Sequence, residues 1–235
     1  LAYLLDAPCL LTSCDDFLAV ESSTVQNWFQ HAKEWIRVDS QEPRRLLDFV
    51  NTPRQYKLGL YAEDLFLHFL EHQTEFELLL HDQQIFNDKQ CIGSMDFIIR
   101  TPEGVVEHWE MAIKFFLQRK PSTDWIDFVG PSHVDSMHRK LTKMVGRQLK
   151  LSQRPEALDY FTKNNIPVPT VHRVFSIGRF FQGYGHPFVA PTGCDPQQPS
   201  GQWIRKSDFI QHFKGTDARW SIRPHPWWIG PDLSE

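Results

Sequence analysis

The chain has 235 residues, of which 41% are hydrophobic and 23% are charged, and its formal net charge is -4. This length and composition are typical of a globular domain that buries a substantial core. The slightly acidic balance excludes a protein that coats nucleic acid indiscriminately, although it is compatible with a local basic patch.

Membrane and export signals are absent from the sequence pattern. No apolar run approaches the ~18 residues that a membrane span needs, and no charged-then-apolar leader opens the chain. Four cysteines show no spacing typical of a metal site, so we interpret them as reduced thiols; they are Cys9, Cys14, Cys91 and Cys194. We therefore expect a cytoplasmic protein without a membrane segment.

The first half of the chain is predicted to be mainly helical. Residues 1–56 are rich in Trp, Phe and Leu, and we expect a helical segment that packs on the core. A long helix is expected from about Lys57 to His81, because no Gly or Pro follows Gly59 within it. A short strand is expected over 84–88.

A β-hairpin follows, with predicted strands at Ile92–Arg100 and Val105–Leu117. The residues between them, "TPEG", include a Pro and a Gly that suit a tight turn. The other expected elements are a helix from about Asp135 to Ser152, a strand over 168–182, a loop over 183–203 and a short helix over 208–213 capped by Ser207. This order of elements predicts an α/β or α+β fold.

Glu63 is the first residue that does not suit its position. Helical periodicity places it in the apolar stripe of the 57–81 helix, among Leu60, Leu67 and Leu70. An ionised carboxylate in such a stripe needs a cation or several hydrogen-bond donors. The alternative is that Glu63 lies at a partly exposed edge of a broad apolar stripe.

The hairpin carries a second set of charges, Asp96, Glu110 and Lys114. Counting outward from the turn pairs Asp96 with Trp109, which places Asp96 and Glu110 on opposite faces of the hairpin. A one-residue change of register, or a bulge, would bring the two carboxylates together. The alternative, a solvated polar face, explains Glu110 and Lys114 better than it explains Asp96.

The predicted helix over 135–152 has a basic stripe with steps of three and four residues. Gln148 projects from the opposite, apolar face of that helix, where a buried amide must find partners. The alternatives are a solvated helix face for the stripe and an ordinary core amide for Gln148. The stripe consists of Lys140, Lys143, Arg147, Lys150 and Arg154.

Taken in order, these residues resemble the PD-(D/E)XK nuclease superfamily. The segment "GLYAE" resembles the Gly-x-x-x-Glu helix motif of its RecB-type branch, "GSMDF" its Gly-x-x-Asp strand, and "QLKLS" its Gln-containing helix motif. The segments "LGLYAE", "HWEMAIKFFL" and "FVGPSHVDSMHRKL" look like an uncharacterised bacterial family of that superfamily, most clearly over 58–183. The resemblance implies a restriction-endonuclease-like three-layer core, in which a mixed central sheet is flanked by helices.

The resemblance also implies roles for the site residues. Asp96 and Glu110 would bind Mg²⁺ or Mn²⁺ with the carbonyl of Met111, and Glu63 would bind a second metal or orient its water. Lys114 would stabilise the nucleophile or the scissile phosphate, and Gln148 would orient that lysine or a water. The basic stripe would contact the phosphate backbone of DNA.

One position departs from the superfamily pattern. In "Glu-x-Lys" the lysine follows the glutamate by two residues, whereas this chain has Ala112 there and Lys114 two residues further along. His108 shares the face of Glu110 and is an optional base or ligand. A catalytically weakened or inactive nuclease fold that binds nucleic acid or a partner protein is therefore the main alternative. A hydrolase that uses Glu63 and Glu110 as an acid/base pair is a further one.

The resemblance suggests a division of the chain into three parts. Residues 1–56 are an N-terminal helical segment packing on the core, 57–190 are the nuclease-like core, and 191–235 are a loop-rich, Trp-rich extension of the same domain. The expected partner is nucleic acid, in particular DNA.

Overall fold

The structure is a computed structural model, and it describes residues 4–5, 7–39, 41, 57–72, 75–194, 200–217 and 219–222. Within this part of the chain, a seven-stranded mixed sheet has the order β1-β6-β4-β3-β2, with β5 paired to β4 and β7 paired to β6. The strands are β1 (Leu18–Ala19), β2 (Glu77–Asn87), β3 (Gln90–Arg100), β4 (Val106–Gln118), β5 (Phe128–Val129), β6 (Val171–Gly183) and β7 (Ser200–Trp203).

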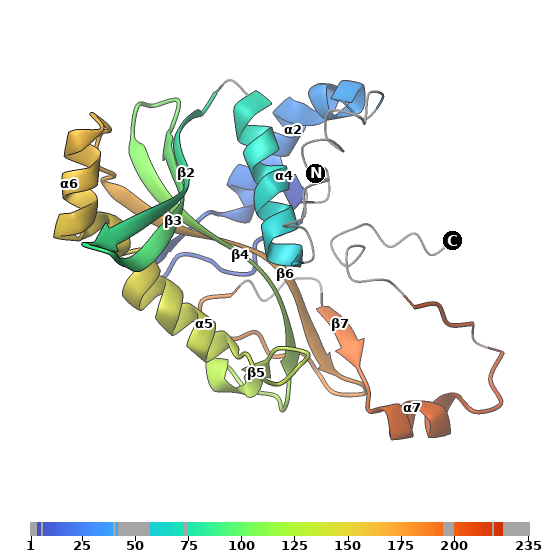
Figure 1. Cartoon of the computed structure of the whole chain (residues 1–235). Helices are drawn as coiled ribbons and strands as arrows, with labels where there is room; N and C mark the ends of the chain where they lie inside the picture. The colour runs from blue at the N-terminus through green and yellow to red at the C-terminus, as the bar shows by residue number, and fades with distance from the viewer. Residues whose placement is uncertain are drawn as a thin grey trace.

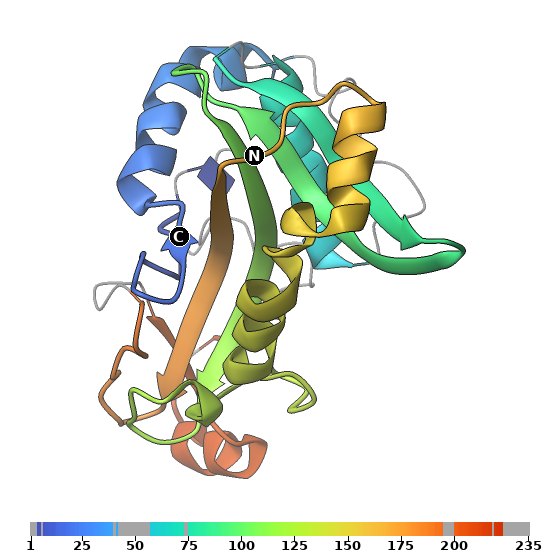
Figure 2. The ribbon, with the colours of Figure 1, turned by 90° about the vertical axis from the view of Figure 1, so that its left-hand side faces the viewer.

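Helices cover both faces of this sheet, so the fold has three layers (Figures 1 and 2). One face is covered by α2 and α4, and the other by α5 and α6, while α7 lies beyond the ends of β6 and β7. The predicted α/β class, with a mixed sheet between helices, is confirmed. The helices are α2 (Ser22–Asp39), α4 (Leu58–His72), α5 (Met137–Lys143), α6 (Pro155–Lys163) and α7 (Lys206–Phe213), with short helical segments η2 (Trp125–Asp127), η3 (Met144–Gln148) and η4 (Leu151–Gln153).

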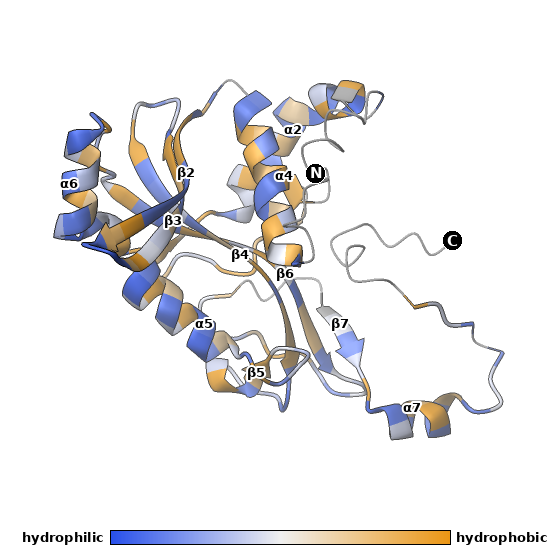
Figure 3. Ribbon diagram, viewed as in Figure 1, coloured by the Kyte–Doolittle hydropathy of each residue, from blue (hydrophilic) through white to orange (hydrophobic). Residues whose placement is uncertain are grey.

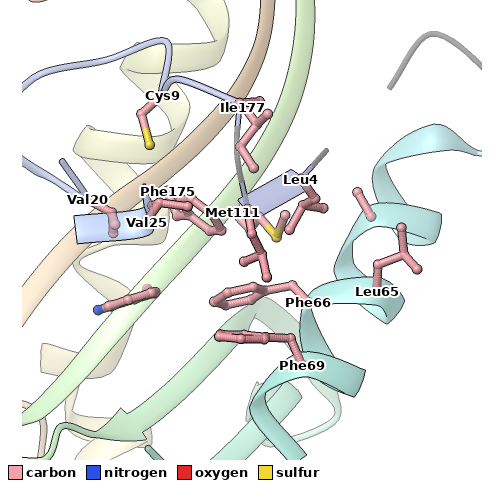
Figure 4. Packing of buried hydrophobic residues seen from close by; sticks show 14 of the residues in the cluster. Leu4, Cys9, Val20, Val25, Leu65, Phe66, Phe69, Met111, Phe175 and Ile177 are labelled. Carbon is pink, nitrogen blue, oxygen red and sulfur yellow. The ribbon is translucent and has the colours of Figure 1, made fainter. Parts of the chain in front are cut away.

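The largest hydrophobic cluster lies between α4 and the sheet (Figure 4). Phe66 of α4 packs edge-on against Phe97 of β3 and stacks with Trp109 of β4, with ring centroids 5.3 and 6.0 Å apart. Trp28 joins the cluster from α2 and stacks on Trp109 at 5.4 Å. Apolar and polar residues accordingly alternate around α4 and α5 (Figure 3). Burial of these rings holds α4, and therefore Glu63, against the sheet.

The helix predicted over 57–81 is shorter than expected. It ends at His72, and residues 77–81 belong instead to β2. The leucines of this segment suit either a helix or a strand, and their pairing with β3 decides the outcome, since Leu78 lies opposite Ile99 and Leu80 opposite Ile98. Tertiary pairing therefore overrides the local helical pattern.

The helix predicted over 135–152 is also wrong in its second half. After α5 the chain forms a π-helical segment, η3, and then the 3-10 segment η4. A separate helix, α6, begins at Pro155, a residue that suits the first turn of a helix but not its interior. The 208–213 helix is observed as α7, but its N-cap is Arg205, without a side-chain cap, so Ser207 does not cap it. Strand β7 lies within the segment predicted as a loop.

Two expectations fall partly outside the described residues. They concern 42–56 of the N-terminal segment and the tail from 223 onward, which includes Trp227 and Trp228. In the described part of the chain, no helix has the combined length and apolar character required to cross a lipid bilayer. The four cysteines there are free thiols.

Candidate functional site

The register of the β3–β4 hairpin differs by one residue from the predicted register. Phe97 lies opposite Trp109, and the paired residues follow in step as far as the turn. The turn has five residues rather than four, closed by a hydrogen bond from the Thr101 N–H to the Val105 carbonyl at 2.8 Å, with Gly104 at φ +84°. A left-handed φ of this kind favours glycine. The prediction that Asp96 faces Trp109 is therefore wrong.

The observed register brings Asp96 next to Glu110. The backbone N–H of Met111 donates a hydrogen bond to Asp96 Oδ2 at 2.8 Å, and the carboxyl groups of Asp96 and Glu110 are close enough to affect each other's pKa. Beyond Phe97 the ladder between β3 and β4 stops, while β4 continues to pair with β6 and β3 with β2 along their other edges. The two carboxylates thus lie where the two strands separate.

The alternation of side chains along β3 is interrupted at Asp96. Met95 belongs to the hydrophobic cluster beneath α6, whereas Phe97, two residues later, belongs to the cluster beneath α4. In a regular strand both would lie on one face. On the neighbouring strand β2, Asp82 has φ +44°, an uncommon value for a residue other than glycine. Irregular backbone on both strands therefore flanks the carboxylate of Asp96.

Glu110 is fully buried, at 0% exposure, and is held by two side chains. His108 Nε2 lies 3.0 Å from Glu110 Oε1, and Gln148 Nε2 donates to Glu110 Oε2 at 2.5 Å. Gln148 ends the π-helical segment η3, in which the Leu149 N–H bonds to the Met144 carbonyl, five residues back, at 2.9 Å. Such π-helical turns occur frequently at functional sites. The sequence prediction that Gln148 enters the site from a buried helix face is consistent with this contact.

Burial raises the pKa values of three carboxyl groups here, and repulsion between carboxylates adds to it for two of them, Asp96 and Glu63. Burial is the largest cause in each case, and it raises the pKa of Asp96 to about 7, that of Glu110 to about 7 and that of Glu63 to about 8. The charge of Glu110 adds to the effect on Asp96, and the charge of Asp96 adds to the effect on Glu63. Glu63 of α4 therefore lies within electrostatic reach of Asp96, and its half-buried position is compatible both with a site residue and with the partly exposed edge of the apolar stripe.

Asp82 is a fourth carboxylate near the site, and the sequence argument did not identify it. It raises the pKa of Glu63 and accepts a hydrogen bond from the Ser94 hydroxyl at 2.7 Å. Its only signal in the sequence is a charge in a segment predicted to be near a helix end. The strand pairing that brings Asp82 toward Asp96 is visible only in the fold.

The lysine predicted for the site is elsewhere. Lys114 Nζ forms an ion pair with Asp135 Oδ2 at 2.6 Å, and 33% of its side chain is exposed. Lys140, assigned from the sequence to the basic stripe, is instead the cation whose charge lowers the pKa of Glu63, Asp96 and Glu110.

Lys140 comes close to the place where the superfamily pattern has its lysine. Ala112 is buried beneath α5, in a cluster with Met137 and Leu141, and it lines a cavity of about 20 Å³ together with Lys140 and Lys114. Burial lowers the pKa of Lys140, and the charge of Lys114 lowers it further, while Asp96 and Glu110 raise it.

The rest of the basic stripe is exposed. Lys143, Arg147 and Lys150 have exposed side chains, and Arg154 bonds to Glu156 at 3.2 Å. Lys143 also lowers the pKa of Glu110, so the stripe begins near the buried pair. Positive charge thus runs outward from the acidic residues along α5, η3 and η4.

The donor atoms suit a hard divalent cation. Within the described residues, no three or more His, Cys, Asp or Glu side chains form a metal-binding group. Mg²⁺, however, is usually held by one or two carboxylates, with water and substrate phosphates supplying the other oxygen ligands. Gln148 Oε1 is buried and has no hydrogen-bond partner in this part of the chain. The pair Asp96 and Glu110, with this amide oxygen nearby, fits such a site.

A recess of about 850 Å³ lies away from these carboxylates, and none of the predicted site residues lines it. It lies between the ends of β4 and β6 and helix α7, and is lined by Arg119, Lys120 and Arg205, among others. Arg119 and Lys120 each lie 3.5 Å from Asp127, and Asp208 also lines the recess, so the positive charge is largely balanced.

Comparison with known proteins identifies the family of the chain. A family model described as "Domain of unknown function (DUF1853)" matches residues 1–235, and the chain belongs to this family. No curated protein and no solved structure matches the chain.

Proposed function

We propose that this DUF1853 protein hydrolyses phosphodiester bonds of DNA with the help of Mg²⁺ or Mn²⁺. The observation that supports the proposal is the cluster of Glu63, Asp96 and Glu110, of which Glu110 is fully buried and the other two are half-buried. Their pKa values are raised to about 8, 7 and 7. Carboxyl groups crowded in this way are stabilised in their ionised form by a cation. Perturbed groups of this kind are also typical of functional sites.

Asp96 and Glu110 would hold the metal, with the carbonyl of Met111 as a further oxygen donor. Bound there, Mg²⁺ would supply Lewis-acid chemistry, polarising a phosphate oxygen and lowering the pKa of a water. Glu63, from the opposite helix, would orient the attacking water. Gln148 holds one oxygen of Glu110 and so helps to fix the direction in which that carboxylate faces.

Lys140 is the best candidate for the lysine of this site. The charge of its ammonium lowers the pKa of all three carboxyl groups. The same charge would stabilise the negative charge that develops on the phosphate in the transition state. Lys114, paired with Asp135, would assist only indirectly, through its charge on Lys140. The proposal therefore retains a lysine in the site despite Ala112.

Three exposed cations, Lys143, Arg147 and Lys150, would position the DNA by contacting its phosphates. Such contacts carry no sequence information and give an affinity that falls with salt. The stripe starts beside Glu110, so a backbone that follows it would bring one phosphate toward the carboxylates. The order of the motifs, which resembles the PD-(D/E)XK superfamily, gives separate support.

The test compares wild type with Asp96→Ala and Glu110→Ala in Mg²⁺- or Mn²⁺-dependent cleavage of linear, circular and single-stranded DNA. We expect cleavage by wild type and a loss of at least about 100-fold in each variant. A matched control is Asp159→Ala, on the outer surface of α6, which should cleave like wild type. Activity that survives both site substitutions would remove the assignment.

A catalytically inactive nuclease fold that binds nucleic acid or a protein is the second candidate. Two observations favour it: both oxygens of Glu110 already accept hydrogen bonds, and Lys114 is paired with Asp135. Calorimetric titration with Mn²⁺ separates the two functions, because a catalytic site must bind the ion. DNA binding without Mn²⁺ binding would favour the inactive fold.

A further inference from the structure

A chain of buried polar side chains leads away from Glu110. His108 Nε2 contacts Glu110 Oε1, and His108 Nδ1 lies 3.0 Å from Ser152 Oγ. Ser152 Oγ in turn lies 3.1 Å from His172 Nε2. Glu110, His108 and Ser152 are all 0% exposed, whereas His172 is half-buried. Three separate elements, β4, η4 and β6, therefore contribute to one hydrogen-bonded path.

When Glu110 is ionised, as metal binding requires, its chemistry sets the direction of the hydrogen bonds made by His108 and Ser152. An ionised carboxylate can only accept, so His108 donates from Nε2 to Glu110. A neutral imidazole has one N–H, and His108 Nδ1 then accepts from the hydroxyl of Ser152. His172 Nε2 also lies 3.3 Å from Gln153 Nε2, an amide nitrogen that can only donate, so His172 Nε2 accepts there and is not a donor to Ser152. The donors of Ser152 and His108 thus both point toward Glu110.

Ser152, His108 and Glu110 include the residue types of a hydrolytic triad, but their burial excludes that role. A nucleophilic hydroxyl must reach a substrate carbonyl or phosphate, and Ser152 has no exposed surface. The same burial suits a role in positioning Glu110. A hydrogen-bond donor whose own orientation is fixed by a second hydrogen bond holds a carboxylate in one orientation.

We infer that His108 and Ser152 are positioning residues that fix the carboxylate of Glu110 for metal binding. The inference rests on the proposed function. His108 holds Oε1 and Gln148 holds Oε2, so the two donors determine the plane of the carboxylate. Each oxygen keeps a second lone pair that can bind a cation. Ser152 does not contact Glu110 in this path. It holds the His108 ring in the orientation in which Nε2 donates to Glu110.

The experiment measures Mn²⁺ binding by calorimetry, with thermal unfolding as a check on folding. The variants are His108→Gln, which retains a donor near Glu110, His108→Phe, which fills the space without one, and Ser152→Ala. Ser176→Ala is the matched control, since Ser176 is another buried serine, at 4% exposure, whose hydroxyl has no partner in the described residues.

For positioning residues, we expect Mn²⁺ affinity to fall about tenfold or more in Ser152→Ala and further in His108→Phe. His108→Gln should bind more tightly than His108→Phe, and Ser176→Ala should bind like wild type. A role in packing alone would reverse the order of the two His108 variants. Wild-type affinity in both Ser152→Ala and His108→Phe would overturn the inference and leave the proposed function intact. No Mn²⁺ binding by wild type would overturn both.

Discussion

Lys114 Nζ lies 2.6 Å from Asp135 Oδ2, in an ion pair that ties β4 to the residue before the N-cap of α5. Glu110 is four residues earlier on the same strand, and its side-chain contacts are with His108 and Gln148. Lys140, one helical turn after Ser136, then supplies the positive charge beside the carboxylates. In the proposed site, the lysine therefore comes from a helix rather than from the strand that carries the glutamate.

The first prediction concerns these two lysines. Replacing Lys140 with Met keeps an unbranched side chain, shorter by one atom, and removes its charge. We expect Lys140→Met to lower the rate of metal-dependent DNA cleavage about 100-fold, because the transition-state charge loses its cation. Lys114→Met should lower it far less. Single-turnover cleavage measures both rates, and the opposite ranking would return the role to Lys114.

The second prediction concerns the pH dependence of metal binding. The pKa values of Asp96 and Glu110 are both raised to about 7, so both carboxyl groups carry protons in acid and lose them near neutrality. A metal binds the ionised form and displaces those protons. Mn²⁺ affinity should therefore rise between pH 6 and pH 8, by up to roughly tenfold per pH unit for each proton displaced. Calorimetry in buffers of different ionisation enthalpy measures the released protons. A flat affinity across this range would contradict the pKa shifts.

The third prediction concerns the stability cost of Glu63. Its pKa rises from 4.5 in the unfolded chain to about 8 in the fold, so the folded form binds a proton more tightly. The stability from that proton is fully present below about pH 4.5 and is lost as pH rises through about 8. Glu63→Gln, which cannot ionise, should therefore be more stable than wild type at pH 9, by on the order of 2 kcal/mol.

Urea unfolding at pH 5 and pH 9 measures this difference. At pH 5 the variant and wild type should differ little, since Glu63 is protonated in the fold. Glu71→Gln, an exposed position on the same helix, is the control and should be neutral at both pH values. A stability gain that is equal at the two pH values would mean that charge is not its cause.

The fourth prediction concerns the basic stripe. Arg147→Gln and Lys150→Gln each remove one exposed cation, and each should reduce the slope of log affinity against log salt by about one for duplex DNA. Lys89→Gln, at the exposed β2–β3 turn, is the control and should leave the slope unchanged. Fluorescence anisotropy in EDTA measures binding without cleavage. An equal effect of all three substitutions would indicate attraction by net charge rather than by the stripe.

Much of the site could be predicted from local patterns. Glu63 stands out because it interrupts an apolar helical stripe, and Asp96 because it interrupts an apolar strand; both anomalies persist in the fold as raised pKa values. Gln148 was identified in the same way, as an amide on a buried face, and it bonds to Glu110. A polar residue in an apolar pattern is informative because its burial is costly unless it has partners.

The hairpin register and the structure of residues 77–81 depended on contacts between segments, which local sequence patterns do not contain. The hairpin has a turn of five residues instead of four, which shifts its register by one residue. This shift decides whether Asp96 lies next to Glu110. Residues 77–81 form a strand because β3 provides an edge with which they pair.

The sequence by itself determined the alternation of helices and strands and the short set of carboxylates that have no place in a purely apolar core, because periodicity and burial cost are properties of neighbouring residues. Only the tertiary structure decided which partners those carboxylates receive. In the sequence, Lys140 and Lys114 are equivalent positive charges. The packing of α5 over Ala112 brings Lys140 near the carboxyl groups, whereas Lys114 forms an ion pair with Asp135. Coulomb energy depends on distance through space, and distances between residues far apart in the chain are set by packing.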